Sequence, residues 1–486
     1  MPNALPRVLI AGVSTRTAAD SAARAGYEVT ALDAFGDLDQ AAGVRGLSMP
    51  RDFGVPFTAS SAARVAASIG CDTVAYVANF ENHPRAVGAL ARGRTLLGNP
   101  PEALRRVRDP LQLAEALERR GVACPIVIPS GGAQRRSRAI AVVPGERKAP
   151  YRDEEGDLTR IPQISQKSAD SLSTGIVATP ALQGLPVEGF CEIGEICGHL
   201  RQVFSGHPGR GTLARDDGDS STARPPAAPF GMTRWLLKPR RSGGGHGIRP
   251  WNPGDPIPRA SYVQERIDGI PGSIAFVAAQ GRAVPLCLTR QIAGDPAFGA
   301  TGFQYCGNIL TGPHDPEFGV DSRLARAAMT LANLVAEEFG LVGVNGIDFV
   351  ARDGTPFLTE VNPRYSASME LVERAGGLSV FSAHAQACTD GTLPSFDFRE
   401  AAVRHGIATG KSIVYAQRDV VCGDTAEWLD NPAVRDVPHP GERIAAGHPV
   451  CTVFADGADA ADCLAALVRQ ADAIYETLEA WASAGV

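Results

Sequence analysis

The chain has 486 residues and a formal net charge of −6, and 44% of its residues are hydrophobic and 21% are charged. This length and composition predict a soluble enzyme of about two to four domains, each able to bury a core. The acidic balance and the lack of basic stretches interleaved with aromatic residues argue against nucleic acid as a partner, and no apolar run reaches the roughly 18 residues of a membrane-spanning helix.

The first 98 residues are predicted to form a Rossmann-like domain. Residues 7–12 and 27–33 are apolar runs typical of buried strands, and the alanine-rich residues 17–25 between them are typical of a helix. Short connections between these elements imply a parallel sheet with a right-handed crossover. The turn after the first strand lacks the glycines of a dinucleotide-binding loop, which excludes an NAD site. No signal peptide precedes the first strand, so we predict a cytoplasmic protein.

A polar run, residues 79–83, follows the next predicted strand at its carboxyl end. Open α/β sheets bind ligands at this edge, so Glu81 and Asn82 are candidate site residues, and surface capping is the alternative for each. The ten cysteines are scattered, and the closest pair, Cys191 and Cys197, lacks the spacing of a zinc site. We therefore expect reduced thiols.

A second domain is predicted from residue 99 to residue 395, with a polar insertion at about 130–230. The insertion is rich in Gly, Ser, Arg, Asp and Pro and has few periodic apolar positions, which is typical of loops or disorder. Two interpretations stay open, because the insertion could cover an active site or simply extend from the domain. Residues 396–486 contain further strand and helix patterns and are predicted to form a small α+β domain.

A glycine-rich loop follows a predicted strand that ends in Lys238. Its bare backbone amides can wrap an anion, to which Lys238 adds a positive charge. The order of Lys and Gly fits neither the common phosphate loop nor the dinucleotide fingerprint, and a plain linker is the alternative. The candidate phosphate-binding residues are Lys238, Ser242, Gly243, Gly244, Gly245, His246 and Gly247.

Residues 342–364 predict a β-hairpin that carries three oxygen donors, Asp348, Glu360 and Asn362. We expect an odd loop of three residues, 352–354, to place all three side chains on one face. Two carboxylates and an amide oxygen suit Mg²⁺, with Mn²⁺ as a second choice, when phosphates and water complete the shell. A solvated hairpin with a polar outer face is the alternative.

Taken in this order, the glycine loop and the acidic hairpin ending in Glu-x-Asn-Pro-Arg resemble the ATP-grasp superfamily. The resemblance implies an α/β and α+β protein, with a Rossmann-like first domain, an ATP-grasp core of two α+β subdomains and a small C-terminal α+β domain. It also implies an adenine hinge at residues 262–269, where the nucleotide-binding candidates are Gln264, Glu265, Ile267 and Asp268. Many relatives have Asp-Lys where this chain has Asp109-Pro110, which leaves Arg108 as a weak candidate for a phosphate contact.

The activity that the resemblance implies is ATP-dependent ligation of a small-molecule carboxylate to an amine. A carboxylate takes the γ-phosphoryl group of ATP, an amine attacks the acyl phosphate, and Arg364 stabilises the charge that develops. Arg290 is a further candidate for contacting a phosphate or the substrate carboxylate, with a solvent-facing arginine as the alternative. A homodimer is compatible with this interpretation.

Within the superfamily, the chain looks most similar to archaeal-type predicted carboligases. These include tyramine-glutamate ligase-like enzymes, which would imply a role in making methanopterin-type or methanofuran-type one-carbon coenzymes. A carboxylase that activates bicarbonate is one alternative activity. A nucleotide-binding regulatory protein without turnover is another.

Overall fold

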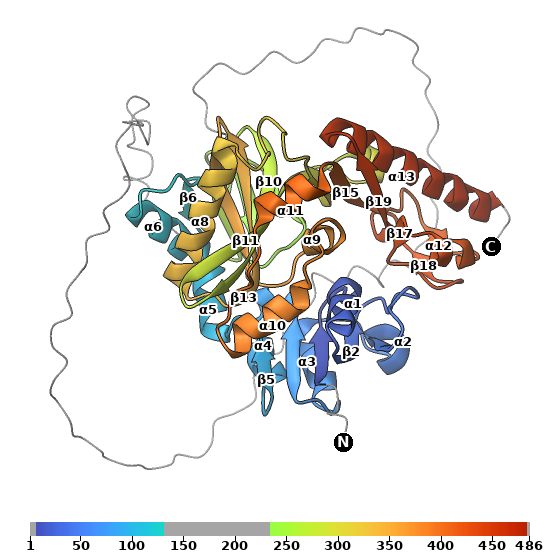
Figure 1. Ribbon diagram of the computed structural model, residues 1–486. Coiled ribbons are helices and arrows are strands. Elements are labelled where there is room, and N and C mark those ends of the chain that lie inside the picture. Colours follow the sequence, from blue (N-terminus) through green and yellow to red (C-terminus); the bar gives the residue numbers. More distant parts are fainter. Residues whose placement is uncertain (1–5, 131–233, 484–486) are drawn as a thin grey trace, which may run out of the picture. The chain divides into compact units, whose positions relative to one another are not determined.

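The computed structural model describes residues 6–130 and 234–483. What the sequence predicts for the insertion lies almost wholly outside the described residues. The described chain forms three larger sheets and a small two-stranded one, with helices against them (Figure 1). Within these residues, no helix is both long and apolar enough to cross a membrane.

The first domain is a five-stranded parallel sheet in the order β3-β2-β1-β4-β5, as the Rossmann-like prediction expects. Its inner strands are mostly apolar and mostly buried because helices cover both faces. The elements are β1 (Arg7–Ala11), α1 (Arg16–Arg24), β2 (Glu28–Asp33), β3 (Val44–Ser48), α2 (Met49–Phe53), α3 (Ala59–Ala66), β4 (Thr73–Tyr76), the 3₁₀ turn η1 (Phe80–Asn82), α4 (Pro84–Leu90) and β5 (Thr95–Leu97).

Two helices, α5 (Pro101–Val107) and α6 (Pro110–Arg119), lead into a four-stranded sheet in the order β6-β9-β7-β8. Its strands are β6 (Val127–Pro129), β7 (Arg234–Pro239), β8 (Arg249–Trp251) and β9 (Ser261–Arg266). Pro129 of β6 and Lys238 of β7 both pair with Tyr262 of β9. The two ends of the insertion are therefore held on either side of one strand.

An eight-stranded sheet in the order β14-β13-β10-β11-β12-β15-β19-β17 forms the largest part of the fold. Helix α8 (Arg323–Phe339) lies along β10, β11 and β14 and buries a face of Ala, Leu and Val against the sheet. The core strands are β10 (Ile270–Ala279), β11 (Arg282–Ala293), β12 (Tyr305–Leu310), β13 (Gly343–Arg352) and β14 (Thr355–Asn362), with the 3₁₀ turn η3 (Pro296–Phe298) before β12. Helices α9 (Met369–Gly376) and α10 (Val380–Thr389) pack on the other side, where α10 also contacts α1.

Apart from a two-stranded sheet formed by residues 420–421 and 443–444, the C-terminal strands belong to the large sheet. After α11 (Phe398–His405), strand β15 (Ala408–Tyr415) hydrogen-bonds to β12 and so extends the large sheet across the predicted boundary at residue 396. The remaining elements are β16 (Val420–Val421), α12 (Ala426–Asp430), β17 (Val434–Arg435), β18 (Arg443–Ile444), β19 (Pro449–Gly457) and α13 (Ala460–Ser483). The expected α+β content is present, but it is joined to the core through the β12–β15 ladder.

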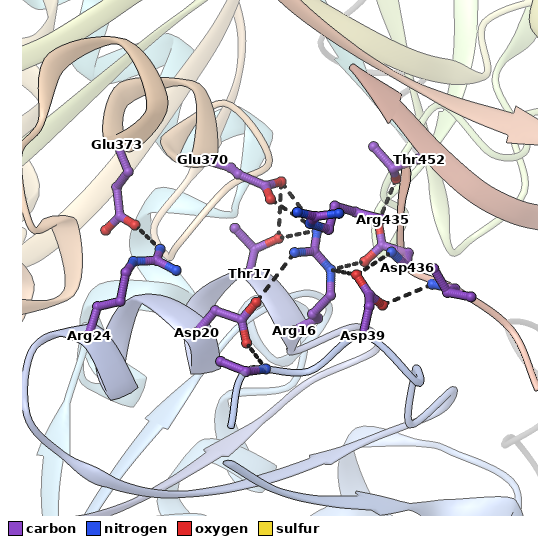
Figure 2. A network of polar contacts seen from close by, with 12 residues as sticks. Arg16, Thr17, Asp20, Arg24, Asp39, Glu370, Glu373, Arg435, Asp436 and Thr452 are labelled. Carbon is purple, nitrogen blue, oxygen red and sulfur yellow. Dashed lines mark hydrogen bonds and ion pairs between the residues drawn. The ribbon is translucent and has the colours of Figure 1, made fainter. Parts of the chain in front are cut away.

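A buried arginine joins the first domain to the rest of the chain (Figure 2). The side chain of Arg16 is 2% exposed and makes ion pairs of 3.1 Å to Glu370 in α9 and 2.6 Å to Asp436 after β17. Asp20 and Asp39 lie 3.5 and 3.6 Å away. Burial opposes ionisation of Glu370, but Arg16 and Lys411 outweigh it and hold the pKa of that carboxyl well below its usual range.

Candidate active site

The hairpin of β13 and β14 places Asp348, Glu360 and Asn362 on one face. Asp348 pairs directly with Glu360, and Asn362 pairs with Gly346 two residues away, so their side chains project to the same side. The expected three-residue loop is wrong, because the turn has two residues, Asp353 and Gly354, with φ of 52° and 68°. The odd number of residues between Asp348 and Glu360 comes instead from one extra residue, Thr359, in a β-bulge that shifts the register between Asp348 and Phe349.

Asp348 is the centre of a partly buried polar cluster. Its Oδ2 accepts a hydrogen bond of 2.8 Å from Asn362 Nδ2, and its Oδ1 accepts one of 2.7 Å from Gln291 Nε2. Burial, and then the neighbouring charge of Glu360, raise the pKa of Asp348 to about 6. Asn362 in turn accepts a bond of 3.3 Å from Arg364 Nη2 through its Oδ1. Two carboxylates that oppose each other in this way favour a cation between them.

Glu360 forms an ion pair with Arg108, which the sequence indicates only as a weak candidate for a phosphate contact. Arg108 also donates to Val361 O at 2.9 Å, to Asn82 Oδ1 at 2.8 Å and to Ser242 O at 3.2 Å. One guanidinium therefore links the β13–β14 hairpin, the loop after β4 and the glycine loop. Burial alone would raise the pKa of Glu360, but Arg108 and then Lys238 lower it below its usual value.

A pocket lies between the glycine loop and the hairpin, and Lys238 and Glu360 both line it. Lys238 Nζ donates a hydrogen bond of 3.1 Å to Gln264 Oε1, so the cation is fixed from β9. The lining residues are Val107, Arg108, Pro110, Leu113, Lys238, Pro239, Arg240, Ser242, Gly243, Gly245, Ile248, Tyr262, Thr359, Glu360 and Val361. The structure thus brings the predicted phosphate loop and part of the predicted metal site together around one space.

The glycine loop has a second reason for its composition. A Cβ on Gly245 would lie 1.8 Å from the carbonyl oxygen of Phe303, so only glycine fits this close approach. Tyr305 N donates to Gly244 O at 3.0 Å, and Ser242 Oγ donates to His246 O at 2.6 Å. The loop therefore packs on the segment that leads into β12 as well as lining the pocket.

Other predicted residues are placed differently. Arg290 pairs with Gly272 on the opposite face of the sheet from Asp348, and its guanidinium lies 5.7 Å from the centre of the Phe318 ring. Side chains alternate along β11, so Gln291 reaches Asp348 and the prediction that Arg290 faces the reacting groups does not fit the structure.

The hinge residues have mixed surroundings. Glu265 Oε2 accepts a hydrogen bond of 3.2 Å from the backbone of Ile126, and Ile267 is buried. Asp268 is exposed and lies 3.5 Å from Arg266. The nucleotide roles of these residues and of Gln264 stay predictions.

The loop after β4 closes the other side of the cluster. Glu81 is 1% exposed, and its Oε1 accepts a hydrogen bond of 3.0 Å from Arg364 Nε. Asn82 bonds to Arg108 and, through Nδ2, to Ser242 O at 3.4 Å. The two residues that the sequence singles out here are therefore buried against Arg364 and Arg108, in agreement with the position expected for ligand-binding loops of an open α/β sheet.

Comparison with known proteins identifies the domain that this site belongs to. Residues 221–368, which carry the glycine loop and the hairpin, match the family described as the ATP-grasp domain. The chain contains an ATP-grasp domain. The comparison with curated protein sequences found no match.

Solved structures share the fold of this ATP-grasp protein over most of its length. An L-amino acid ligase from Bacillus licheniformis has a TM-score of 0.55 and 14% identity, covering 96% of this chain and 97% of that one. The biotin carboxylase domain dimer of Hydrogenobacter thermophilus 2-oxoglutarate carboxylase, in complex with MgADP, ADP and bicarbonate, has a TM-score of 0.51 and 12% identity, covering 92% and 85%. Rhizobium etli pyruvate carboxylase has a TM-score of 0.59 and 13% identity, and the match covers 96% of this chain but only 37% of that enzyme. These identities are low, so the likeness establishes the fold.

Proposed function

We propose that the protein is an ATP-dependent ligase that activates a substrate carboxylate as an acyl phosphate for attack by an amine. The observation that carries the proposal is the placement of Asp348, Glu360 and Asn362 on one face, beside a pocket lined by Lys238 and Arg108. Glu360, one of the three oxygen donors, lines this pocket with the two cations, and phosphoryl transfer requires both a metal ligand and cations for the phosphates. The ligase fold of the Bacillus licheniformis enzyme supports the same class.

The cluster fits Mg²⁺ in its chemistry. All three donors are hard oxygens. Burial, and then the charge of Glu360, raise the pKa of Asp348 to about 6, and a bound cation would favour the ionised carboxylate. Among the described residues no group of three or more His, Cys, Asp or Glu side chains could hold a metal, so phosphate and water oxygens would have to complete the shell. When bound, Mg²⁺ would neutralise charge on the β- and γ-phosphates.

Arg108 would supply the phosphate contact that relatives obtain from lysine. Its guanidinium pairs with Glu360 and lines the same pocket as Lys238 and Gly243. A metal on Glu360 would compete with this ion pair and release Arg108 toward the phosphates of the nucleotide. The exchange keeps both charges paired, which matters because an unpaired buried charge is costly.

Arg364 and Glu81 would form the side of the site that meets the acid and the amine. A carboxylate oxygen of the acid attacks the γ-phosphorus, and ADP leaves. The amine nitrogen then attacks the acyl carbon, the bond to the phosphate oxygen breaks, and phosphate departs with that oxygen. Arg364, held by Glu81 and Asn362, would stabilise the charge on the acyl phosphate and on the departing phosphate.

The finer parts of the proposal rest on the sequence. A role in one-carbon coenzyme biosynthesis and a homodimer are proposed on the ground of the resemblance, and a cytoplasmic location is proposed with them. A bicarbonate-activating carboxylase is the second candidate, because the fold is shared with a biotin carboxylase domain whose structure contains MgADP and bicarbonate.

Isotope transfer tests the chemistry. The acid would first be found by ADP release across pairs of carboxylates and amines, with bicarbonate as a separate arm. The acid labelled with ¹⁸O in its carboxylate should then transfer one label to released phosphate. Label in AMP would contradict the mechanism, ADP release driven by bicarbonate without an added acid would favour the carboxylase, and no ADP release in any arm would favour a regulatory protein.

A further inference from the structure

Helices α3 and α4 of the first domain form the walls of a surface pocket away from the nucleotide site. On α3, the lining positions Ser60, Ala63, Arg64 and Ala67 recur at helical spacing, so they share one face. Arg85, Ala86, Ala89 and Arg92 repeat the pattern along α4 and just beyond its end. The pocket between the two faces has a volume of about 530 Å³.

The nine residues that line this pocket are of two kinds. Ser60 and four alanines have small side chains, on two helices that are in contact, and of these residues Ala63 and Ala86 are buried. The other four are arginines. Right-handed crossovers place α3 and α4 on the same face of the parallel sheet, opposite α1, which packs against α10. The pocket is therefore on the face of the first domain that does not carry the α1–α10 contact.

One of the four arginines that line the pocket has a structural role. Arg94 Nη2 donates to Ala66 O and Ile69 O, both at 2.6 Å, and thereby satisfies carbonyl groups at the end of α3. Arg64, Arg85 and Arg92 make no ion pair or side-chain hydrogen bond with any described residue, and the lining contains no acidic side chain. In a chain with 53 acidic and 47 basic residues, three unneutralised arginines around one hollow are a local excess of positive charge.

We propose that this pocket binds a small polyanion that carries two or more phosphate or carboxylate groups. Each guanidinium can hold such a group through two parallel hydrogen bonds, and three of them around one space favour a ligand with several anionic groups over a single ion. The volume falls in the range of about 300 to 1,000 Å³ that is common for small-molecule sites. Because the arginines are exposed, salt should weaken the binding.

Calorimetric titration of the full chain at low salt tests this site, with pyrophosphate and citrate as probes. The groove variant is R64Q/R85Q/R92Q, and the matched control R404Q/R418Q/R469Q removes three exposed arginines elsewhere. Pyrophosphate could also enter the nucleotide pocket, but that contribution is common to all three proteins. We expect the wild type and the control to bind alike and the groove variant to bind at least about tenfold more weakly or with one site fewer.

The two probes separate the sources of the anion. Binding of pyrophosphate alone would assign the site to phosphate groups, citrate alone to carboxylate groups, and both to the shared chemistry. Equal binding by all three proteins, or no binding of either probe by the wild type, would overturn the proposal. The variant R64K/R85K/R92K keeps the three positive charges but lacks the planar guanidinium groups, so its affinity should lie between those of the wild type and of the groove variant. Unchanged ATP affinity in the groove variant checks that its fold is intact.

Discussion

Replacing Arg108 with methionine should damage both the stability of the fold and ATP binding. The guanidinium is 10% exposed and its partner Glu360 is 29% exposed, so the ion pair is largely but not fully buried. Breaking a fully buried pair costs about 3 to 5 kcal/mol, and the partial exposure of Glu360 reduces this to about 3 kcal/mol or less. Three further acceptors, on Val361, Asn82 and Ser242, lose a donor.

The effect of Arg108→Met on ATP affinity distinguishes a contact with the nucleotide from a purely structural role. A charge-assisted hydrogen bond to phosphate contributes about 1.5 to 3 kcal/mol, which corresponds to a loss of roughly 10- to 100-fold in ATP affinity. Urea unfolding would give the stability, and calorimetric titration of the folded variant with MgATP would give the affinity. Arg108→Lys should recover part of the affinity, because the charge remains.

A control on the adjacent helix makes this test specific. Arg106 is exposed, donates to Glu338 O at 2.7 Å and stacks on Phe339. Arg106→Met should change the free energy of unfolding by no more than about 1 kcal/mol and leave ATP binding unaltered. If Arg108→Met is destabilised but binds MgATP within about threefold of the wild type, Arg108 is only structural and the reasoning about the missing lysine is refuted.

Four further predictions concern the same fold. Glu360→Gln should abolish turnover with the fold intact, and activity within about threefold of wild type would exclude the metal site. Because Asp348 has a pKa of about 6, Mg²⁺ affinity measured by calorimetry should fall about tenfold per pH unit below pH 6 and level off above it, a slope that Asp348→Asn removes. Burial lowers the pKa of His384 to about 4, and its Nδ1 accepts from Val344 N at 2.9 Å. As the pH is lowered, the unfolded state therefore binds a proton before the folded state does. The free energy of unfolding measured in urea should fall as the pH is lowered from 6.5 to 4, and it should fall less in His384→Gln. Replacing residues 131–220 with a short flexible linker should leave melting temperature and ATP affinity nearly unchanged, since β9 holds both flanking strands, and a large loss of affinity would place the segment in the active site.

The β13–β14 hairpin could be predicted from the sequence, but its exact geometry could not. The three oxygen donors and the turn glycine are visible as a local pattern. The bulge at Thr359 has no such signature, because it depends on how β14 pairs with β13. The prediction of a shared face is correct only because the bulge supplies the odd residue that we assigned to the loop.

Contacts between distant segments are harder to predict from the sequence. Arg290 and Gln291 look equivalent in the sequence, and only the register of β11 shows that Gln291 is the one that faces Asp348. Arg108 lies two residues before Pro110, the position where many ATP-grasp enzymes have lysine, and this is a local signal, but its pairing with Glu360 spans 252 residues. Asp20 lies four residues after Arg16 on the same helix, but the other three carboxylates around Arg16, those of Asp39, Glu370 and Asp436, come from separate segments, so no local pattern indicates these three.

The β12–β15 ladder makes the C-terminal residues part of the large sheet. Four residue pairs, from Gly307 with Ser412 to Leu310 with Thr409, are paired across it. A chain that ended near residue 396 would leave β12 as an open edge, with its backbone donors and acceptors free to pair with another copy. Truncation at that boundary should therefore yield self-associating protein, because the C-terminal residues complete the large sheet rather than form a separate module.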